Sequence, residues 1–453
     1  MKMKRFVIIV VVLALLPATI SVDAAILPAT LPWTSTRVDG DFISGLGTYV
    51  SLAHDPITGK AFISYYEDFN QDLRIAYQVH SGSGNCGTTN DWVCEIVDST
   101  GAVGRYSSID VTHVQAANPS VSYLKIGISY FDDTNDALKY AEAIFTTFPT
   151  WTIDVIEDSP GNASFGEYSS LKFTSDHKPR IAYHYSLNLT PSLGAVKLAW
   201  FIGDSSGNCG SGNNWRCDLV DGKNNHPNYG THVSLDLDYQ DSVRIAYYDP
   251  VEGDLYYAYL IMYVNDSCMN PAWACNIIDH VGDVGRFVSI HAPKSGSDYL
   301  QFAYFDATEK EVRYAYPEPG HGFVSFAVDN TGNIPGDMGL SLAVDTQGYP
   351  IIAYMNTESY GNGSDLKIAR PATVYGRDAG NCGDLKPYSM LPYQYWFCET
   401  IASGGEISKL AEYAALSIDP SGLAAVAYFM ADMSGRLMIA RQWYAIFLPI
   451  IEN

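Results

Sequence analysis

The chain has 453 residues, of which 47% are hydrophobic, 13% aromatic and 17% charged, and its formal net charge is −23. This composition is globular, and the length suits one large domain or two to three average ones. So negative a chain repels phosphate backbones and anionic membranes, which excludes nucleic acid as a partner and leaves cations, neutral sugars and basic protein surfaces.

The first 24 residues are predicted to be a secretory signal peptide. Lys2, Lys4 and Arg5 precede the apolar run 6–16, and small residues lead up to a cleavage site near Ala24. The run is too short to span a bilayer as a helix, so the mature chain has no predicted transmembrane span, although a retained signal anchor is the alternative. Cleavage removes three positive charges and one negative charge, which makes the net charge −25. We expect a secreted protein, either extracellular or in the cell envelope.

The eight cysteines fall into four near-neighbour pairs. These are Cys86 with Cys94, Cys209 with Cys217, Cys268 with Cys275, and Cys382 with Cys398. Disulfides within each pair are the expected arrangement, in agreement with export to an oxidising compartment. Zinc is the competing interpretation, but the spacings are not those of paired CxxC sites and no histidine stands at ligand spacing beside them.

Four short signatures recur in fixed order along the chain. The first puts a small residue before an aliphatic one, at Ser51, Ser108, Ser170, Ser234, Ser289, Ser341 and Ala415. The second ends on Tyr65, Tyr130, Tyr183, Tyr247, Tyr304, Tyr354 and Tyr428. The third ends on Ala76, Ala141, Ala199, Ala258, Ala315, Ala369 and Ala440. The fourth puts an acid six residues after Trp92, Trp151, Trp215, Trp273 and Phe323, but Ala402 follows Trp396.

The repeat predicts an all-β fold, a seven-bladed β-propeller with four antiparallel strands per blade. The fourth signature occurs six times after residue 45, and its seventh copy is the N-terminal segment 33–39. That segment is therefore expected to complete the last blade and close the ring, which hides two sheet edges; an open solenoid, the competing repeat fold, would gain nothing from it. The blades are predicted at about 46–98, 101–158, 163–221, 228–279, 284–329, 336–402, and 410–443 plus 31–40, within a domain 25–443 that the apolar tail 444–453 follows.

The unit at 345–354, DTQGYPIIAY, resembles secreted bacterial repeat proteins whose units read SLxxDxxGxPxIaYyDxxxxdLkyA. The resemblance covers about residues 31–443 and implies a propeller. More distantly, the architecture is similar to fucose-lectin-type and sialidase-type propellers. Residues 417–422, SIDPSG, begin like the Asp-box of sialidases but continue with Leu-Ala-Ala where that box has Trp, which argues against sialidase activity.

Two groups of residues are expected on one face of the ring. The first precedes the innermost strands and contains the candidate ligand-binding residues Tyr49, Arg105, Tyr106, Tyr168 and Arg286. A ring face takes the C–H groups of a sugar while a charged neighbour takes its hydroxyls. Packing between blades is the alternative for the aromatic residues, because features shared by every repeat usually serve packing. The two arginines escape that argument, since only two units have them.

The second group is acidic and includes the candidates Asp132, Asp249 and Asp306. Converging carboxylates would bind calcium, the one cofactor that the sequence suggests, or would act as general acid and base. Turn formation is the alternative for aspartates in loops. The chain contains no HExxH or P-loop motif, and no catalytic residue is assigned.

The favoured hypothesis is a secreted, non-catalytic binding protein that holds carbohydrate on one propeller face. A glycoside hydrolase or sialidase-like enzyme is the second hypothesis, and an extracellular protein-interaction scaffold is the third. The expected partner is accordingly a carbohydrate or an extracellular protein.

Overall fold

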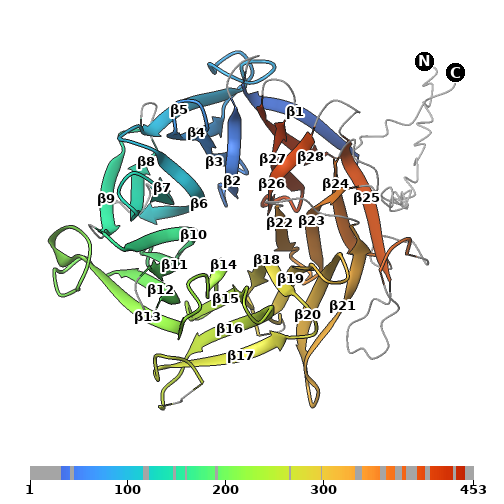
Figure 1. The fold of residues 1–453 in the computed structure, drawn as a ribbon. Coiled ribbons are helices and arrows are strands. Elements are labelled where there is room, and N and C mark those ends of the chain that lie inside the picture. The colour runs from blue at the N-terminus through green and yellow to red at the C-terminus, as the bar shows by residue number, and fades with distance from the viewer. Residues whose placement is uncertain are drawn as a thin grey trace, which may run out of the picture.

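Seven four-stranded antiparallel sheets surround a central axis in the computed structural model (Figure 1). The structure describes residues 32–40, 45–115, 122–145, 149–158, 161–188, 192–264, 267–296, 298–331, 339–357, 364–372, 380–383, 395–403, 409–431 and 435–443. The predicted seven-bladed β-propeller is confirmed. The predicted signal peptide 1–24 and tail 444–453 lie outside the described residues. In the described part of the chain, no helix has the length and apolar character needed to cross a membrane.

In six blades the strands follow one another from the axis outward in chain order, and the seventh differs only in its outer strand. The innermost strands are β2 (Leu46–His54), β6 (Val103–Gln115), β10 (Ala163–Phe173), β14 (Thr231–Leu237), β18 (Val284–His291), β22 (Leu340–Val344) and β26 (Lys409–Ile418). The second strands are β3 (Ala61–Glu67), β7 (Ser122–Asp132), β11 (Pro179–Leu187), β15 (Val243–Asp249), β19 (Gln301–Asp306), β23 (Pro350–Thr357) and β27 (Ala424–Ala431). The third strands are β4 (Asp72–Gln78), β8 (Ala137–Ile144), β12 (Leu193–Phe201), β16 (Asp254–Leu260), β20 (Glu311–Glu318), β24 (Ser364–Pro371) and β28 (Arg436–Gln442). The outer strands are β5 (Trp92–Asp98), β9 (Thr152–Glu157), β13 (Trp215–Asn224), β17 (Trp273–Asp279), β21 (Gly322–Asn330), β25 (Trp396–Ser403) and β1 (Trp33–Asp39).

The ring is closed by its N-terminal strand, as predicted. β1 pairs antiparallel with β28, from Trp33 opposite Gln442 to Asp39 opposite Leu437, and thereby becomes the outer strand of the last blade (Figure 1). This pairing covers the outer edge of β28, so that both edges of β28 are hydrogen-bonded within the sheet.

The small residue of the first signature has a bonding role between blades. In six blades its serine hydroxyl accepts a hydrogen bond from the backbone N–H of the following blade's innermost strand. The pairs are Ser51 with Ile109, Ser108 with Leu171, Ser170 with Leu235, Ser234 with Ile290, Ser289 with Leu342, and Ser341 with Leu416, all at 3.0–3.1 Å. Ala415 has no hydroxyl, so this bond is missing where the last blade meets the first.

The tyrosine of the second signature is buried and donates its hydroxyl to the fourth-signature acid of the preceding blade. The pairs are Tyr65 with Asp39, Tyr130 with Asp98, Tyr183 with Glu157, Tyr247 with Asp221, Tyr304 with Asp279, and Tyr354 with Asp329. A cation of the third strand joins five of these acids, as Lys139 joins Asp98 at 3.2 Å. Buried polar groups need such partners, so the signature acid is a structural residue.

The junction between blades six and seven lacks this arrangement. Ala402 stands where the acid would be, and the strand neighbour of Tyr428 is Met438 in place of a cation. The carboxylate and the cation are therefore lost together at this junction.

Four disulfides are present, and each joins the predicted near neighbours within one blade. They are Cys86–Cys94, Cys209–Cys217, Cys268–Cys275 and Cys382–Cys398, with Cα separations of 5.2–6.0 Å. In three of them the residue before the first cysteine is an asparagine whose side chain makes two hydrogen bonds to the backbone of the second cysteine. Asn85, for example, donates to the carbonyl of Cys94 and accepts from its N–H.

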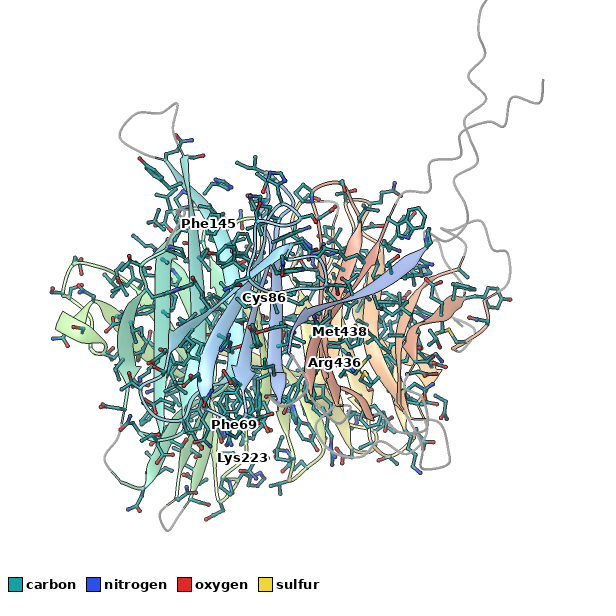
Figure 2. The ribbon with its side chains drawn as sticks, turned by 90° about the horizontal axis from the view of Figure 1, so that it is seen from above. Phe69, Cys86, Phe145, Lys223, Arg436 and Met438 are labelled. Atoms are coloured by element: carbon teal, nitrogen blue, oxygen red, sulfur yellow. A yellow bond between two sulfur atoms is a disulfide. The ribbon has the colours of Figure 1, made fainter. Side chains whose placement is uncertain are left out.

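The ring has two faces, seen edge-on in Figure 2. Phe69, in the loop after β3, and Lys223, near the end of β13, lie at one face, and Phe145, just after β8, lies at the other (Figure 2). The innermost strands run from the Phe69 face to the Phe145 face, so the first residues of these strands lie at the Phe69 face.

Candidate functional site

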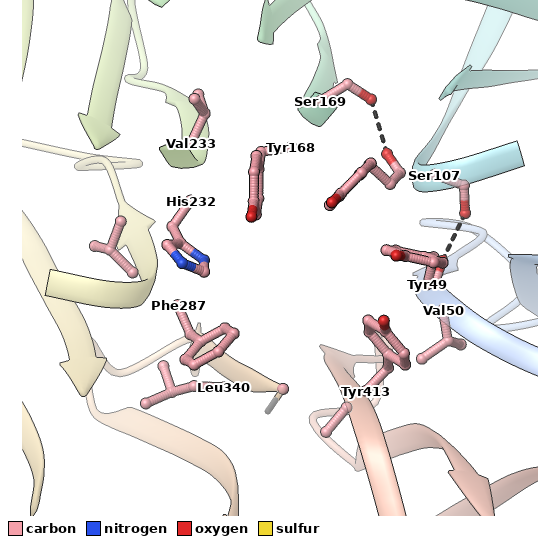
Figure 3. Close-up of a pocket in the computed structure, with 14 residues that line it drawn as sticks. Tyr49, Val50, Ser107, Tyr168, Ser169, His232, Val233, Phe287, Leu340 and Tyr413 are labelled. Atoms are coloured by element: carbon pink, nitrogen blue, oxygen red, sulfur yellow. Dashed lines mark hydrogen bonds between the residues drawn. The ribbon is translucent and has the colours of Figure 1, made fainter. Parts of the chain in front are cut away.

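Aromatic side chains from six blades surround the central axis (Figure 3), each two residues before the first-signature position of its innermost strand and therefore toward the Phe69 face. Their ring centroids follow one another at 4.5–4.8 Å in the order Tyr413, Tyr49, Tyr106, Tyr168, His232 and Phe287. Gly339 holds the equivalent place in the sixth blade, where a Cβ would lie only 2.0 Å from the backbone nitrogen of Ala414. The chain of rings is therefore open at one point.

A β-bulge turns each aromatic side chain toward the axis. The strand register shifts at these positions, for example between Arg105 and Ser108, and φ is +49° at Tyr49 and +54° at Tyr106. Bulky residues avoid positive φ, so the backbone is strained here and the surrounding structure must hold it in place. Ser107 does so by donating its hydroxyl to the Tyr49 carbonyl at 2.8 Å (Figure 3).

These residues line an axial cavity of about 190 Å³. Burial, and after it the nearby positive charge of Arg286, lower the pKa of His232 to about 3, so this imidazole is neutral at physiological pH. Burial raises the pKa of Tyr106 far above its usual value, and the neighbouring Tyr168 contributes to this. The axial cavity is thus an uncharged, aromatic surface.

A second and larger cavity of about 720 Å³ opens beside the axial one, and we call it the 4–5 pocket. Its lining comes from blades three, four and five: Glu167, Tyr168, Asn228, Thr231, His232, Tyr248, Pro250, Asp283, Arg286, Phe287, Phe305, Ala307 and Lys310. Tyr168, His232 and Phe287 line both cavities, so the two are continuous.

Arg286 is the central side chain of the 4–5 pocket. Its guanidinium lies 6.0 Å from the ring centroid of Tyr248, which belongs to the preceding blade. Asp283 fixes both groups, because it accepts from Arg286 Nη2 at 2.5 Å and from the Tyr248 hydroxyl at 2.5 Å. Among the described residues these bonds use Nε and Nη2 of Arg286, which leaves Nη1 to donate to a ligand.

Arg105 repeats this arrangement between blades one and two. Its guanidinium lies 5.5 Å from the ring centroid of Tyr66 in the preceding blade. Asp133 forms an ion pair with Arg105 at 3.3 Å. Both arginine side chains keep about 40% exposure, at 36% for Arg105 and 43% for Arg286. The two Arg–Tyr sites are therefore accessible on the face that carries the axial cavity.

The three acidic candidates form their own turns. Asp132 accepts from the backbone N–H groups of Thr134 and Asn135, Asp249 from that of Val251, and Asp306 from those of Thr308 and Glu309. Their exposure is 0–1%, and none of them lines the axial cavity or the 4–5 pocket. Lys139 also pairs with Asp132 at 2.7 Å, so that carboxylate is fully engaged.

Within the described residues, one group of three potential metal ligands lies close together, namely Asp39, Cys86 and Cys94. Cys86 and Cys94 form a disulfide and offer no thiolate. Calcium at the acidic loops stays a prediction.

The structure therefore brings Tyr49, Tyr106 and Tyr168 together and places Arg105 and Arg286 at two separate blade junctions. Sequence reasoning missed the tyrosine partners, Tyr66 and Tyr248, and the acid Asp283. A signal for the tyrosines exists, because the Tyr-Tyr doublets 65–66 and 247–248 occur only in the blades that precede an arginine blade.

No protein-family model matches the chain, and no curated protein matches it either. The Aleuria aurantia lectin, solved with alpha-methyl-L-fucoside, is similar in structure with a TM-score of 0.42 and 11% identity over 77% of this chain and 95% of that one. The intramolecular trans-sialidase of Ruminococcus gnavus gives 0.41 and 10% over 90% and 97%. A mutant of AofleA from Arthrobotrys oligospora gives 0.41 and 11% over 82% and 91%. At these values the likenesses carry no conclusion about what this chain binds.

Proposed function

We propose that the protein is an extracellular, non-catalytic carbohydrate-binding protein that uses its two Arg–Tyr sites. The observation that carries the proposal is the 4–5 pocket, where Arg286 lies over Tyr248 in a cavity of about 720 Å³ that continues into the aromatic axial cavity. Cavities of this size suit small ligands, with a few fixed polar groups setting orientation.

The chemistry of this pocket matches a sugar. The rings of Tyr168, His232 and Phe287 offer apolar faces for C–H groups. Arg286 offers planar donors to hydroxyl oxygens, and Asn228 offers both a donor and an acceptor. A mixture of flat apolar surface and fixed polar groups is what a pyranose, with its apolar and hydroxylated sides, requires.

Binding is favoured over hydrolysis by the state of the two carboxylates in the pocket. Asp283 is bonded to Arg286 and Tyr248, and Glu167 accepts from His184 Nδ1 at 3.2 Å. A glycosidase needs one carboxyl group as acid and another as base or nucleophile. Carboxylates tied to side chains in this way act as acceptors that orient a ligand.

The extracellular location is supported by the disulfides. Four local disulfides persist in oxidising compartments and are rare in the cytosol.

A glycan array with the mature chain, residues 25–453, tests the proposal. We expect discrete binding that Arg286→Ala and Arg105→Ala each weaken, and that the double variant abolishes. Arg216→Ala is the control, because this arginine is 61% exposed on the outer strand β13, away from both sites. Binding that survives the double variant in folded protein, or no binding to any glycan, would refute the proposal.

A further inference from the structure

A cavity on the opposite face of the ring lies where the first and last blades meet, and we call it the closure cavity. It begins at the far end of β2 from Tyr49 and has a volume of about 410 Å³. Its lining residues are His54, Thr58, Gly59, Lys60, Gln78, Val79, His80, Asp419, Leu423, Ala424, Ala425, Arg441 and Gln442. It shares no residue with the axial cavity or the 4–5 pocket.

The closure cavity is lined by cationic side chains, although the chain as a whole is negatively charged. Lys60 and Arg441 are cationic, and the chain as a whole has a formal charge of −23. The one carboxylate in the lining, Asp419, is bound within its own turn, where it accepts from the Ser421 N–H and hydroxyl and from the Leu423 N–H.

Arg441 has an internal counterpart in the sixth blade. Arg370 stands at the same place in the third strand, since Arg370 is opposite Phe397 in the outer strand and Arg441 is opposite Thr34. In the sixth blade Glu399, two residues after Phe397, forms an ion pair with Arg370. The residue at that position of β1 is Thr36, so the seventh blade keeps the arginine and lacks its carboxylate.

The guanidinium of Arg441 is enclosed without an anion. It lies 4.9 Å from the ring centroid of Trp92, and its Nη2 is buried with no hydrogen-bond partner. Among the described residues no carboxylate forms an ion pair with it, and Asp91 and Asp419 act on it only through longer-range attraction, which raises its pKa. Burial lowers the pKa of Arg441 to about 10, so it is still charged at neutral pH. Enclosing an unpaired charge is costly, and an anion in the cavity would offset that cost.

We propose that the closure cavity binds a small hydroxylated carboxylate of monosaccharide size, with its carboxylate on Arg441. A guanidinium binds a carboxylate strongly through charge-assisted hydrogen bonds. The neutral polar groups around it suit hydroxyls: Gln442 uses its carbonyl oxygen to accept from the Ala424 N–H, which leaves its amide N–H groups to donate. Lys60, at the rim, adds attraction for the anion.

His54 reports on this site from within the cavity. Burial, and after it the charge of Arg441, lower the pKa of His54 to about 4, while the charge of Asp419 acts in the opposite direction. A bound carboxylate would offset that positive charge, so the pKa of His54 should rise when the site fills.

Titration of the mature chain with D-glucuronate tests the proposal, with D-glucose and sulfate as companion probes. We expect calorimetric binding of glucuronate, none of glucose, and weaker binding of sulfate. Arg441→Gln should weaken glucuronate binding by about 10- to 100-fold, the usual range for a charge-assisted hydrogen bond. Arg216→Gln, which removes an exposed arginine elsewhere, should leave binding unchanged. Absence of glucuronate binding, equal binding by folded Arg441→Gln, or sulfate binding as tight as glucuronate would overturn the assignment.

A second measurement applies if Arg441→Gln does not fold. The His54 ring resonances of the wild-type protein, assigned with His54→Gln, are followed against pH with and without saturating glucuronate. A higher pKa of His54 in the presence of glucuronate supports the site, and an unchanged value overturns it. Because the closure cavity shares no residue with the two Arg–Tyr sites, its failure and that of the proposed carbohydrate sites are separate results.

Discussion

The junctions between blades are alike in their buried half and differ in their exposed half. In the buried half, a tyrosine binds an acid of the preceding blade at six junctions, as Tyr130 binds Asp98 at 2.8 Å. In the exposed half, the described residues place an arginine over a tyrosine at two junctions, through Arg105 on Tyr66 and Arg286 on Tyr248. The difference teaches that repetition marks what holds the ring together, whereas the exceptions mark where a ligand can be recognised.

The largest expected effect comes from the buried half. Asp98→Ala should lower the free energy of unfolding by about 3 kcal/mol, because it leaves the buried Tyr130 hydroxyl and one bond of Lys139 without an acceptor. Urea denaturation measures this, and glycan binding should be unaffected. Asp204→Ala, in an exposed loop, is the control and should leave the stability nearly unchanged. A loss below about 1 kcal/mol for Asp98→Ala would show that the acid is dispensable.

His54 is expected to contribute to the stability of the fold in a way that is lost at acidic pH. Its pKa in the folded protein, about 4, lies below the unfolded value of 6.5, so the unfolded chain binds more protons between these values. Stability from this group is complete above about pH 6.5 and falls as the pH drops toward 4, by up to about 3 kcal/mol. Unfolding free energies of wild type and His54→Gln across this window test it. Parallel pH profiles would contradict the expected sign and origin.

The exception among the buried junctions gives a matched pair of variants. Tyr130→Phe should cost about 1–3 kcal/mol, because it leaves the buried Asp98 short of a donor. Tyr428→Phe should cost less than about 0.5 kcal/mol, since Ala402 provides no carboxylate there. Thermal and urea unfolding of both proteins give the comparison. Equal costs would mean that the acid does not determine the value of the tyrosine hydroxyl.

The smallest effect on stability is expected in the exposed half. Arg286→Ala removes a pair whose side chains are 43% and 32% exposed, so the unfolding free energy should change by less than about 1 kcal/mol. Glycan affinity should nevertheless fall at least about tenfold, because the arginine donates to the ligand. A large loss of stability would instead place Arg286 with the structural residues.

The sequence predicted the fold because each strand signature recurs, and ring closure followed from one displaced copy at 33–39. The fourth-signature acid was recognised as a recurring residue, but its role as the acceptor for a buried tyrosine depends on a contact between neighbouring blades, which the sequence does not show. Arg105 and Arg286 stood out by their rarity, whereas Tyr66 and Tyr248 did not, since nothing in one unit shows which residue of the preceding unit it will meet. The closure cavity could not be predicted, because it joins residues such as His54 and Arg441 that meet only when the ring closes.

Stoichiometry by isothermal titration with the glycan that binds best on the array tests the central claim most directly. The two Arg–Tyr sites predict two glycans per chain for the wild type, one for Arg105→Ala, one for Arg286→Ala, and none for the double variant. A single binding site that persists in both single variants would contradict the account. The ligand would then bind at residues that the blades share and not at the two Arg–Tyr sites.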